Sequence, residues 1–247
     1  MPDGTRADFD ARVHALWANY YDVEVSQHQR PGTSFRVRAN YDDHVQFWQI
    51  DQHVYVETAQ PLMERVKALA QPGRALSGGE VRHAWEKLTP PIHATLDIGH
   101  LYYLYPADFQ PCPPAANFSL RKLTPSDKGL MDELHAANPE DEADEADVQV
   151  AHDHVVGVFH ESQLVAAASI YRWRGFIDPG VITHPDFRGR GLGKAVVSAL
   201  CQHVLSAGLG IMIYRSNTEN LGSVGIAKAL GFSHYFVNEG LWLDVAD

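Results

Sequence analysis

Apolar and polar residues recur with two different periods along the first part of the chain, and these periods predict its elements. A helical spacing, with apolar residues three and four positions apart, is found over Phe9–Tyr20, Pro61–Leu69 and Gly79–Leu88. Stretches rich in valine and aromatic residues, typical of strands, are found over Ser34–Arg38, His44–Glu57 and Leu101–Tyr105. The first part is therefore expected to be a mixed α+β region, in which no chemical motif is visible.

The second part has a sharper order of strands and helices. Strands are expected over Phe118–Leu123, His154–Phe159, Gln163–Tyr171, Arg174–Thr183 and Gly210–Tyr214. Helices are expected from Thr124 to Ala137, from Lys194 to Ala207 and over Leu221–Leu230, with a further helix or its leading turn at Glu140–Asp147. Two last strands, Phe232–Val237 and Leu241–Val245, are expected to close the sheet of this part. The alternation of strands and helices predicts an α/β (α+β) fold class.

A proline-rich segment separates the two parts. Residues 106–117 contain four prolines, which do not fit inside a helix or a central strand. We therefore expect an N-terminal α+β domain of unknown role over residues 1–105, a linker over 106–117 and a second domain over 118–247.

Composition excludes several classes of protein. Hydrophobic residues make up 45% of the 247 residues, which is enough for a packed core. The longest uninterrupted apolar stretch, Leu164–Ala168, is far shorter than the ~20 residues of a membrane-spanning helix. The first ten residues lack the apolar segment of a secretory signal. Only Cys112 and Cys201 are cysteines, so no disulfide framework is visible and a cytoplasmic protein is expected.

The formal net charge of −11 disfavours nucleic acid as a partner, because an acidic chain repels phosphates. The run Glu140–Asp147 supplies six of the acidic residues. Such a run attracts a cationic amine by electrostatic steering, or it is simply a solvated helix face. Both interpretations stay open from the sequence.

The clearest candidate for a binding site is the segment Thr183–Lys194, which lies between an expected strand and an expected helix. Gly189, Gly191 and Gly193 alternate in it, so that backbone amides can approach one anion without a Cβ in the way. The N-terminus of the following helix adds positive potential, and the arginines and lysine of the segment add charge. A phosphate or diphosphate is the expected guest. The spacing matches neither the dinucleotide fingerprint nor the P-loop, whose patterns fail at Lys194 and Arg188.

Two motifs in the second part are similar to those of the GNAT superfamily of acetyl-CoA-dependent N-acetyltransferases. The first is Arg188-Gly-Arg-Gly-Leu-Gly193, which matches the family pattern [QR]-x-x-G-x-[GA]. The second is Asn220-Leu-Gly-Ser223, followed by Leu230-Gly-Phe232. The resemblance covers about residues 118–247 and is nearest to bacterial members with an extra N-terminal region. It implies a mixed, mostly antiparallel sheet flanked by helices.

The resemblance also implies how acetyl-CoA is held. The backbone of the glycine turn would bind the diphosphate, the end of the preceding strand would pair with the pantetheine amides, and two residues after the next strand would contact the pantetheine arm or the adenosine end. The residues concerned are Arg188, Gly189, Arg190, Gly191, Leu192, Gly193 and Lys194 for the diphosphate, Val181, Ile182 and Thr183 for pantetheine, and Asn220 and Ser223 for the arm.

The catalytic groups are less defined, because the family's usual tyrosine acid falls at Ala227. Tyr214 or Tyr235 could replace it, although either could be a packing residue. Asp178 and His184 are candidate bases, beside a water relay, and the sequence Pro179-Gly180 is expected to disturb the strand register around Asp178. Amides at Ile182 and Thr183 are the implied oxyanion donors.

Two functions of different kinds follow. The first is transfer of an acetyl group, or a longer acyl group, from acetyl-CoA to a small-molecule or protein amine by direct attack in a ternary complex. The second is a CoA-binding regulatory or scaffold module with little turnover, which the alanine at position 227 favours. A homodimer is possible. His152 and His154 form the densest histidine cluster in the sequence. No recognised metal-binding motif accompanies them, so a metal is not expected.

Overall fold

The computed structural model describes residues 4–244, which form two compact units. Unit 1 comprises residues 4–9, 102–214 and 221–233, and unit 2 comprises residues 10–101, 215–220 and 234–244. The units therefore run across the boundaries expected at 105 and 118. The chain passes from unit 2 to unit 1 and back twice, so the two units are not contiguous halves joined by one linker.

Unit 1 contains a four-stranded antiparallel sheet in the order β5-β6-β7-β8. Its strands are β5 (Ser119–Lys122), β6 (His154–His160), β7 (Gln163–Trp173) and β8 (Phe176–Thr183). Its helices are α4 (Lys128–Ala136), α5 (Glu140–Ala146), α6 (Leu192–Ala207) and α7 (Leu221–Ala229). These elements lie where the hydrophobic pattern predicts them, and the antiparallel sheet flanked by helices confirms the predicted fold class.

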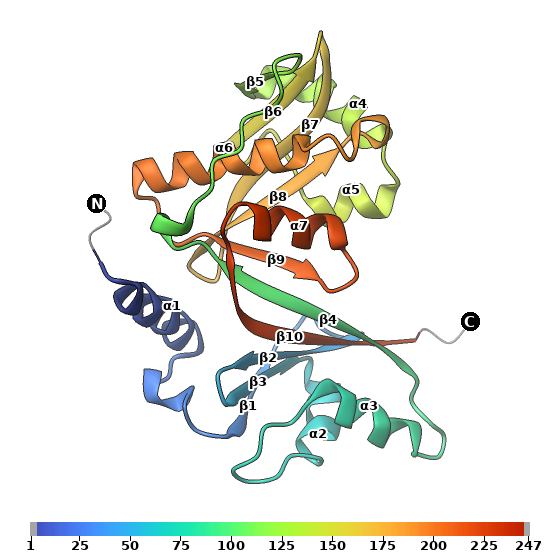
Figure 1. Cartoon of the computed structure of the whole chain (residues 1–247). Coiled ribbons are helices and arrows are strands. Elements are labelled where there is room, and N and C mark those ends of the chain that lie inside the picture. The colour runs from blue at the N-terminus through green and yellow to red at the C-terminus, as the bar shows by residue number, and fades with distance from the viewer. Residues whose placement is uncertain (1–3, 245–247) are drawn as a thin grey trace. The chain divides into compact units, whose positions relative to one another are not determined.

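Alternating residues of the unit 1 sheet face two different helix layers. Val156 and Val158 of β6 pack with α6, whereas Val155 and Phe159 pack with the α4 side. Because successive side chains of a strand point to opposite faces, both faces of this strand are apolar and both are covered. Figure 1 shows α6 along one face of the sheet and α4 and α5 on the other. The N-terminus of α6 is thereby fixed beside the end of β8.

A six-stranded sheet, in the order β1-β3-β2-β10-β4-β9, contains the strands of unit 2. The strands are β1 (Gly32–Val37), β2 (His44–Ile50), β3 (His53–Thr58), β4 (Ala94–Tyr103), β9 (Ile213–Asn217) and β10 (Ser233–Leu243). β1 is parallel to β3, whereas β2 is antiparallel to both β3 and β10.

The last strand corrects the expectation for this segment. The residues expected to form two strands that close the sheet of the second part form a single strand, β10, which pairs with β2 of unit 2. Gly240 does not interrupt it, because this residue is extended and lies opposite Gln46 in an unbroken register. Val245, the expected end of the last strand, lies outside the described residues.

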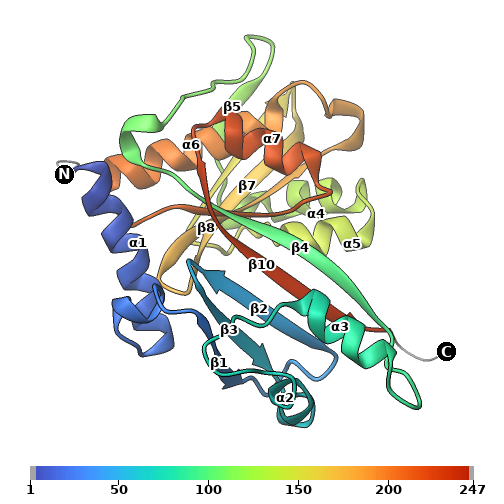
Figure 2. The same cartoon turned by 60° about the horizontal axis from the view of Figure 1, so that its bottom comes forward.

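Helices also cover both faces of the unit 2 sheet. α2 (Gln60–Lys67) and α3 (Gly78–Glu86) pack on Val54 and Val56 of β3 (Figure 2). Residues 10–21 of α1 (Arg6–Tyr21) lie on the other face, where the rings of Tyr21 and Tyr55 stack with centroids 3.8 Å apart. The first part is therefore the mixed α+β region that its pattern predicts.

The proline-rich segment is hydrogen-bonded to other parts of unit 1 and is not a free linker. It begins with a 3-10 helix, Pro106–Asp108. The amide of Gln110 donates to the carbonyl of Leu230 over 3.1 Å, and the amide of Cys112 donates to the Ser198 hydroxyl over 2.8 Å. These bonds attach the segment to α6 and to the end of α7.

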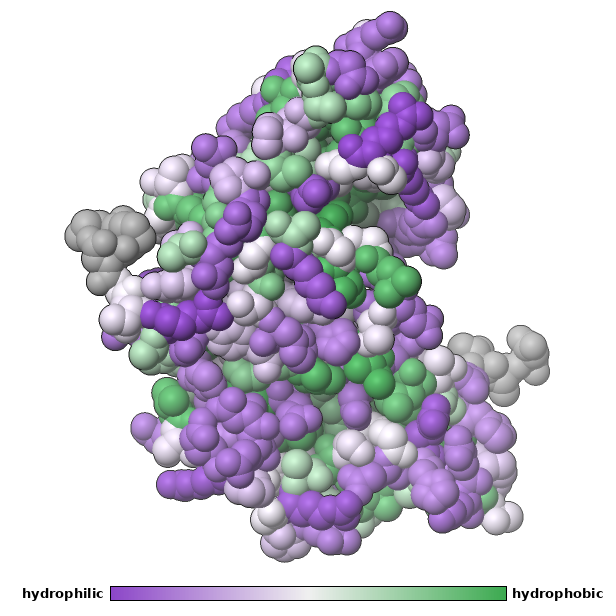
Figure 3. All heavy atoms as spheres, viewed as in Figure 1, coloured by the Kyte–Doolittle hydropathy of each residue, from purple (hydrophilic) through white to green (hydrophobic). Residues whose placement is uncertain are grey.

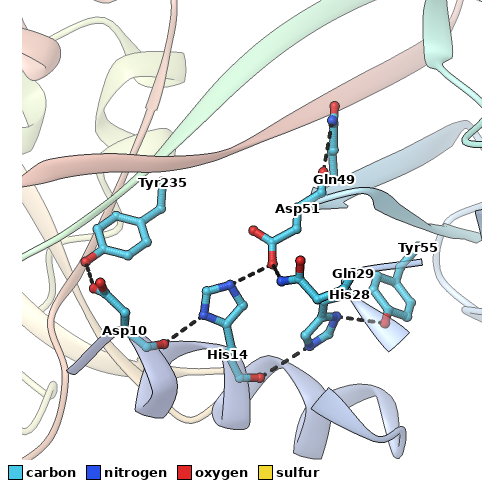
Figure 4. A network of polar contacts seen from close by, with 8 residues as sticks. All are labelled: Asp10, His14, His28, Gln29, Gln49, Asp51, Tyr55 and Tyr235. Atoms are coloured by element: carbon cyan, nitrogen blue, oxygen red, sulfur yellow. Dashed lines mark hydrogen bonds and ion pairs between the residues drawn. The ribbon is translucent and has the colours of Figure 1, made fainter. Parts of the chain in front are cut away.

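A polar network in unit 2 joins α1 to the sheet (Figure 4). His14 contacts the carboxylate of Asp51, in the turn between β2 and β3, over 2.8 Å. His28 is fully buried, with Nε2 3.3 Å from the carbonyl of His14 and Nδ1 3.0 Å from the Tyr55 hydroxyl. Since the carbonyl only accepts, His28 donates from Nε2 and accepts from Tyr55, which is the neutral form.

We expect this network to make folding sensitive to mild acid. Burial lowers the pKa of His28. Below about pH 6.5 the unfolded chain therefore binds a proton that the folded chain does not, and the free energy of unfolding decreases as the pH is lowered. A His28→Gln variant keeps an acceptor and a donor but does not titrate. Its free energy of unfolding in urea should fall less between pH 7.5 and 5.5 than that of the parent protein. His83→Gln, at an exposed position on α3, is the matched control and should fall as the parent does. An equal fall for His28→Gln would contradict the assignment.

Candidate functional site

The glycine turn lies between β8 and α6, as predicted, and its glycines serve two different purposes. Gly189 and Gly191 have φ of +75° and +77°, a left-handed conformation that favours glycine, and a Cβ at either would meet no atom within 4 Å. At Gly193 a Cβ would lie 3.2 Å from both Ile226 and Thr183. The first two therefore shape an open turn, and Gly193 allows α6 to pack closely on β8 and α7.

The amides of residues 189–194 are free to donate to a ligand. Within residues 4–244 they donate no hydrogen bond, and no side chain caps the N-terminus of α6 at Gly191. The helix dipole and these N–H groups together create a site for an anion such as a phosphate. The turn therefore keeps open the backbone amides on which the predicted diphosphate site depends.

The three cations of the turn differ in their surroundings. Arg188 is bound by Asn138, Glu142 and the carbonyl of Thr183. The Arg190 guanidinium lies over the ring of Phe187, 4.9 Å from its centroid. Lys194 is half-buried and forms no ion pair or hydrogen bond with the described residues. From the sequence the three side chains are expected to be equally mobile charges. In the structure, Lys194 is the one whose charge is least engaged by other described residues.

β8 presents one open edge at its C-terminal end. Val181 and Thr183 pair with Ala168 and Ala166 of β7 on one side. On the other side a single parallel bridge joins Ile177 to Met212, and beyond it no described residue continues the ladder along Val181–Thr183. An extended ligand can add there as a further strand.

Asp178 is buried in the middle of β8, with 2% of its surface exposed. The Tyr171 hydroxyl donates to its carboxylate over 3.3 Å. The expected disturbance by Pro179 and Gly180 is wrong: the pairing with β7 continues through both residues. Proline is tolerated because β8 is an edge strand, and Gly180 is needed because a Cβ would lie 2.1 Å from the carbonyl oxygen of Ala146 in α5.

Tyr214 lies at the start of β9 and is almost fully buried. Its hydroxyl is 3.0 Å from the Ser223 hydroxyl in α7. Burial raises the pKa of Tyr214 to about 12, and the negative charge of Asp178 acts in the same direction. The structure therefore brings Tyr214, Ser223 and the charge of Asp178 into one neighbourhood, with the phenol protonated near neutral pH.

His184 and Asn220 occupy turns. The Nδ1 atom of His184 accepts from the amide of Asp186 over 3.2 Å and caps the short helix Pro185–Phe187. Only the Nε2 atom of His184 is left for chemistry. Asn220 directly precedes α7, and its amide donates to the carbonyl of Asn217. It belongs to unit 2.

Comparison with known proteins identifies the family of this site. Residues 120–232, which hold the turn, β8, Tyr214 and α7, match the model of the acetyltransferase (GNAT) family. The chain therefore contains a GNAT acetyltransferase domain. The resemblance seen in the Arg188–Gly193 and Asn220–Ser223 motifs is thereby confirmed.

Two relatives agree with this family, and a solved structure agrees with the fold. A stretch of 90 residues is 29% identical to the L-amino acid N-acyltransferase MnaT of Escherichia coli, covering 32% of this chain and 52% of that protein. A stretch of 60 residues is 33% identical to an L-methionine sulfoximine/L-methionine sulfone acetyltransferase of Pseudomonas aeruginosa, covering 24% of this chain and 35% of that protein. The chain thus spans about half, or less, of the length of these relatives. An acetyltransferase of the GNAT family from Colwellia psychrerythraea, 14% identical, has the same fold over 98% of both chains, with a TM-score of 0.52.

The GNAT domain departs from the family's usual acid at Ala227. This residue is fully buried in the core with α6, where it has no proton to donate. Tyr235, the other phenol considered from the sequence, donates its hydroxyl to Asp10 within unit 2. Of these two phenols, Tyr214 is the one that lies in the GNAT domain, where its hydroxyl is close to Ser223 of α7.

Sequence reasoning missed Asn138 and Tyr171, and it interpreted Glu142 only as one of a run of acids. The run forms α5, with three acids in its first turn and its acidic side chains directed to solvent. Glu142 differs from its neighbours by pairing with Arg188. Its position in the first helical turn was a visible signal, but nothing in the sequence of Asn138 indicated its contact.

The histidines expected to form the densest cluster lie apart. His152 contacts the Ser169 hydroxyl over 2.8 Å, whereas His154 stacks on His203 with ring centroids 3.7 Å apart. In the described part of the chain no three His, Cys, Asp or Glu side chains converge as metal ligands would.

The surface of the molecule mixes hydrophilic and apolar residues on the face drawn in Figure 3. Over residues 4–244, no helix combines the length and the apolar character that crossing a membrane requires.

Proposed function

We propose that the chain is an acetyl-CoA-dependent N-acetyltransferase. The observation that carries the proposal is the set of unpaired amides at residues 189–194, on the N-terminus of α6 in a GNAT domain. In this proposal the backbone from Arg188 to Lys194 holds the diphosphate, and Val181–Thr183 pair with the pantetheine amides. Ser223 contacts the pantetheine arm or the adenosine end.

The chemistry requires an acceptor amine without its proton, a donor to the oxyanion and a proton for the leaving thiolate. Acetyl-CoA, when bound, supplies an acetyl thioester. We assign the oxyanion donors to the amides of Ile182 and Thr183, and the proton donor to Tyr214. We assign the base to Asp178, whose charge already acts on Tyr214; the Nε2 atom of His184 and a water relay are the alternatives.

The acceptor that we propose is a small-molecule amine of the L-amino acid class. Support comes from the names of the two relatives, which act on L-amino acids and on methionine sulfoximine or sulfone. Calorimetry with acetyl-CoA tests the first step; no heat of binding at millimolar ligand would exclude the enzyme. Release of free thiol from acetyl-CoA then tests a panel of L-amino acids, methionine sulfone and a lysine peptide. Turnover with the peptide alone would assign a protein amine instead.

A second candidate function is a CoA-binding module with little turnover. The buried Ala227 in place of the usual tyrosine favours it. The two functions share the binding step and differ in the next one. Binding of acetyl-CoA without thiol release above the amine-free blank, across the whole panel, would select the module.

We expect Tyr214→Phe to lower kcat about 10²-fold with little change in KM for acetyl-CoA, since removal of a general acid costs on that order or more. Because the pKa of Tyr214 is about 12, the phenol keeps its proton at working pH, and the loss should be equal at pH 6.5 and 8.5. Initial rates at saturating acetyl-CoA measure it. Tyr235→Phe, which removes a hydroxyl that donates to Asp10 in unit 2, is the control and should lose less. Unchanged kcat in Tyr214→Phe would remove the residue from the mechanism.

A further inference from the structure

The arginine that opens the glycine turn is bound by groups on neighbouring segments of the chain. Its Nη2 atom donates to Oδ1 of Asn138 over 2.6 Å and to the carboxylate of Glu142, and its Nε donates to the carbonyl of Thr183 over 3.3 Å. The partners lie in three different places: the connection between α4 and α5, the first turn of α5 and the end of β8. One side chain thus joins all three to the turn.

Asn138 is held in place by hydrogen bonds that do not involve Arg188. Only 8% of its surface is exposed, its side-chain amide donates to the carbonyl of Leu134 over 2.8 Å, and its backbone amide donates to His135. With both ends bound, its Oδ1 atom is directed at the guanidinium. Glu142 supplies charge at the same place, since carboxylates are stabilised in the first turn of a helix.

The glycines themselves do little to hold the turn. No neighbour would contact a Cβ at Gly189 or Gly191, so these two glycines give the turn no packing of their own. Gly193 packs on Thr183 and Ile226 at one end, and Arg188 is bound at the other. A mobile turn would have to become ordered when a ligand binds, which lowers affinity.

We propose that Arg188 is a positioning residue for the anion site rather than a ligand of the phosphates, and that Asn138 and Glu142 hold it in place. This inference rests on the proposed function for the identity of the ligand. The opposite view is that Glu142 occupies Arg188 until the diphosphate takes its place. The two views predict changes of opposite sign when Glu142 is removed, because the second view frees a cation for the phosphates.

The test compares Glu142→Ala with Glu145→Ala in the full chain. Glu145 lies in the same helix, is exposed and pairs with no described residue, so both changes remove one negative charge from α5. Calorimetry should show affinity for acetyl-CoA falling about tenfold in Glu142→Ala, the loss of one hydrogen bond to a charged group, and changing less than twofold in Glu145→Ala. Tighter binding by Glu142→Ala would overturn the inference.

A double-mutant cycle shows whether Glu142 acts through Arg188. In an Arg188→Ala background, Glu142→Ala should have no further effect on affinity. A full second loss there would overturn the inference, since it would show that Glu142 acts on the site by itself.

A further measurement needs no ligand, so that failure of the proposed function is seen separately. In the free protein, trypsin should cleave after Arg190 faster in Glu142→Ala than in the parent or in Glu145→Ala, because the turn is released. Equal cleavage rates would overturn the inference even if acetyl-CoA binds. No binding of acetyl-CoA by the parent protein would instead reject the proposed function.

Discussion

Gly191→Glu is expected to abolish binding of acetyl-CoA, with affinity reduced at least about 10²-fold. The carboxylate would stand at the N-cap of α6, beside the amides of residues 189–194, and would repel the diphosphate that they are proposed to hold. A side chain at φ +77° also costs about 1–2 kcal/mol of backbone strain. Calorimetry with acetyl-CoA on the purified variant measures the loss.

Gly208→Glu provides a matched control at the opposite end of the same helix. Gly208 is the C-cap of α6, has φ +62°, and a Cβ there would meet no atom within 4 Å. The change therefore adds the same side chain under similar strain, away from the anion site. Acetyl-CoA should bind to this variant with the parent's affinity. Equal loss in both variants would mean that strain, and not the position of the charge, explains the result for Gly191.

Gly231→Ala is expected to destabilise the protein by about 3 kcal/mol or more. Gly231 follows α7 with φ +89°, and a Cβ there would lie 2.0 Å from the carbonyl oxygen of Asp108 and 2.8 Å from its carbon. Both atoms are backbone atoms, so the proline-rich segment would have to move away from α7. Overpacking and strain of this kind add in the same direction. The free energy of unfolding in urea measures the effect.

Gly225→Ala tests the same substitution six residues earlier in the sequence. Gly225 is exposed within α7, and a Cβ there would contact nothing within 4 Å. Because glycine is unfavourable in a helix, this change should stabilise the protein by about 0.5–1 kcal/mol. If Gly231→Ala proved as stable as the parent, the close approach of Asp108 to the end of α7 would not persist in solution.

The elements of unit 1 could be predicted because their signals are local. The helices α6 and α7 are followed by Gly208 and Gly231, and β6 and β7 contain long apolar runs bounded by polar residues. The turn at Gly189 and Gly191 could be predicted for the same reason, because it needs positive φ and glycine adopts positive φ readily.

The errors concern pairings between distant segments. β10 carries the aromatic and valine residues of a strand but no mark of its partner, and residues 51–232 separate it from β2. The partners of the Arg188 side chain could not be predicted for the same reason. The motif gives its position, but whether its guanidinium meets a phosphate or Asn138 depends on where the α4–α5 connection passes. Register and side-chain direction between elements are set by packing, which one sequence does not display.

The place of β10 in its sheet affects how the chain can be made. β10 lies between β2 and β4 in the strand order, yet it follows all of unit 1 in the sequence. As the chain emerges from a ribosome, the strands β1–β4 are complete long before the strand that belongs between two of them exists. The facing edges of β2 and β4 therefore stay unpaired while unit 1 is synthesised. A fragment that ends at the proline-rich segment would leave these edges free to pair with other chains.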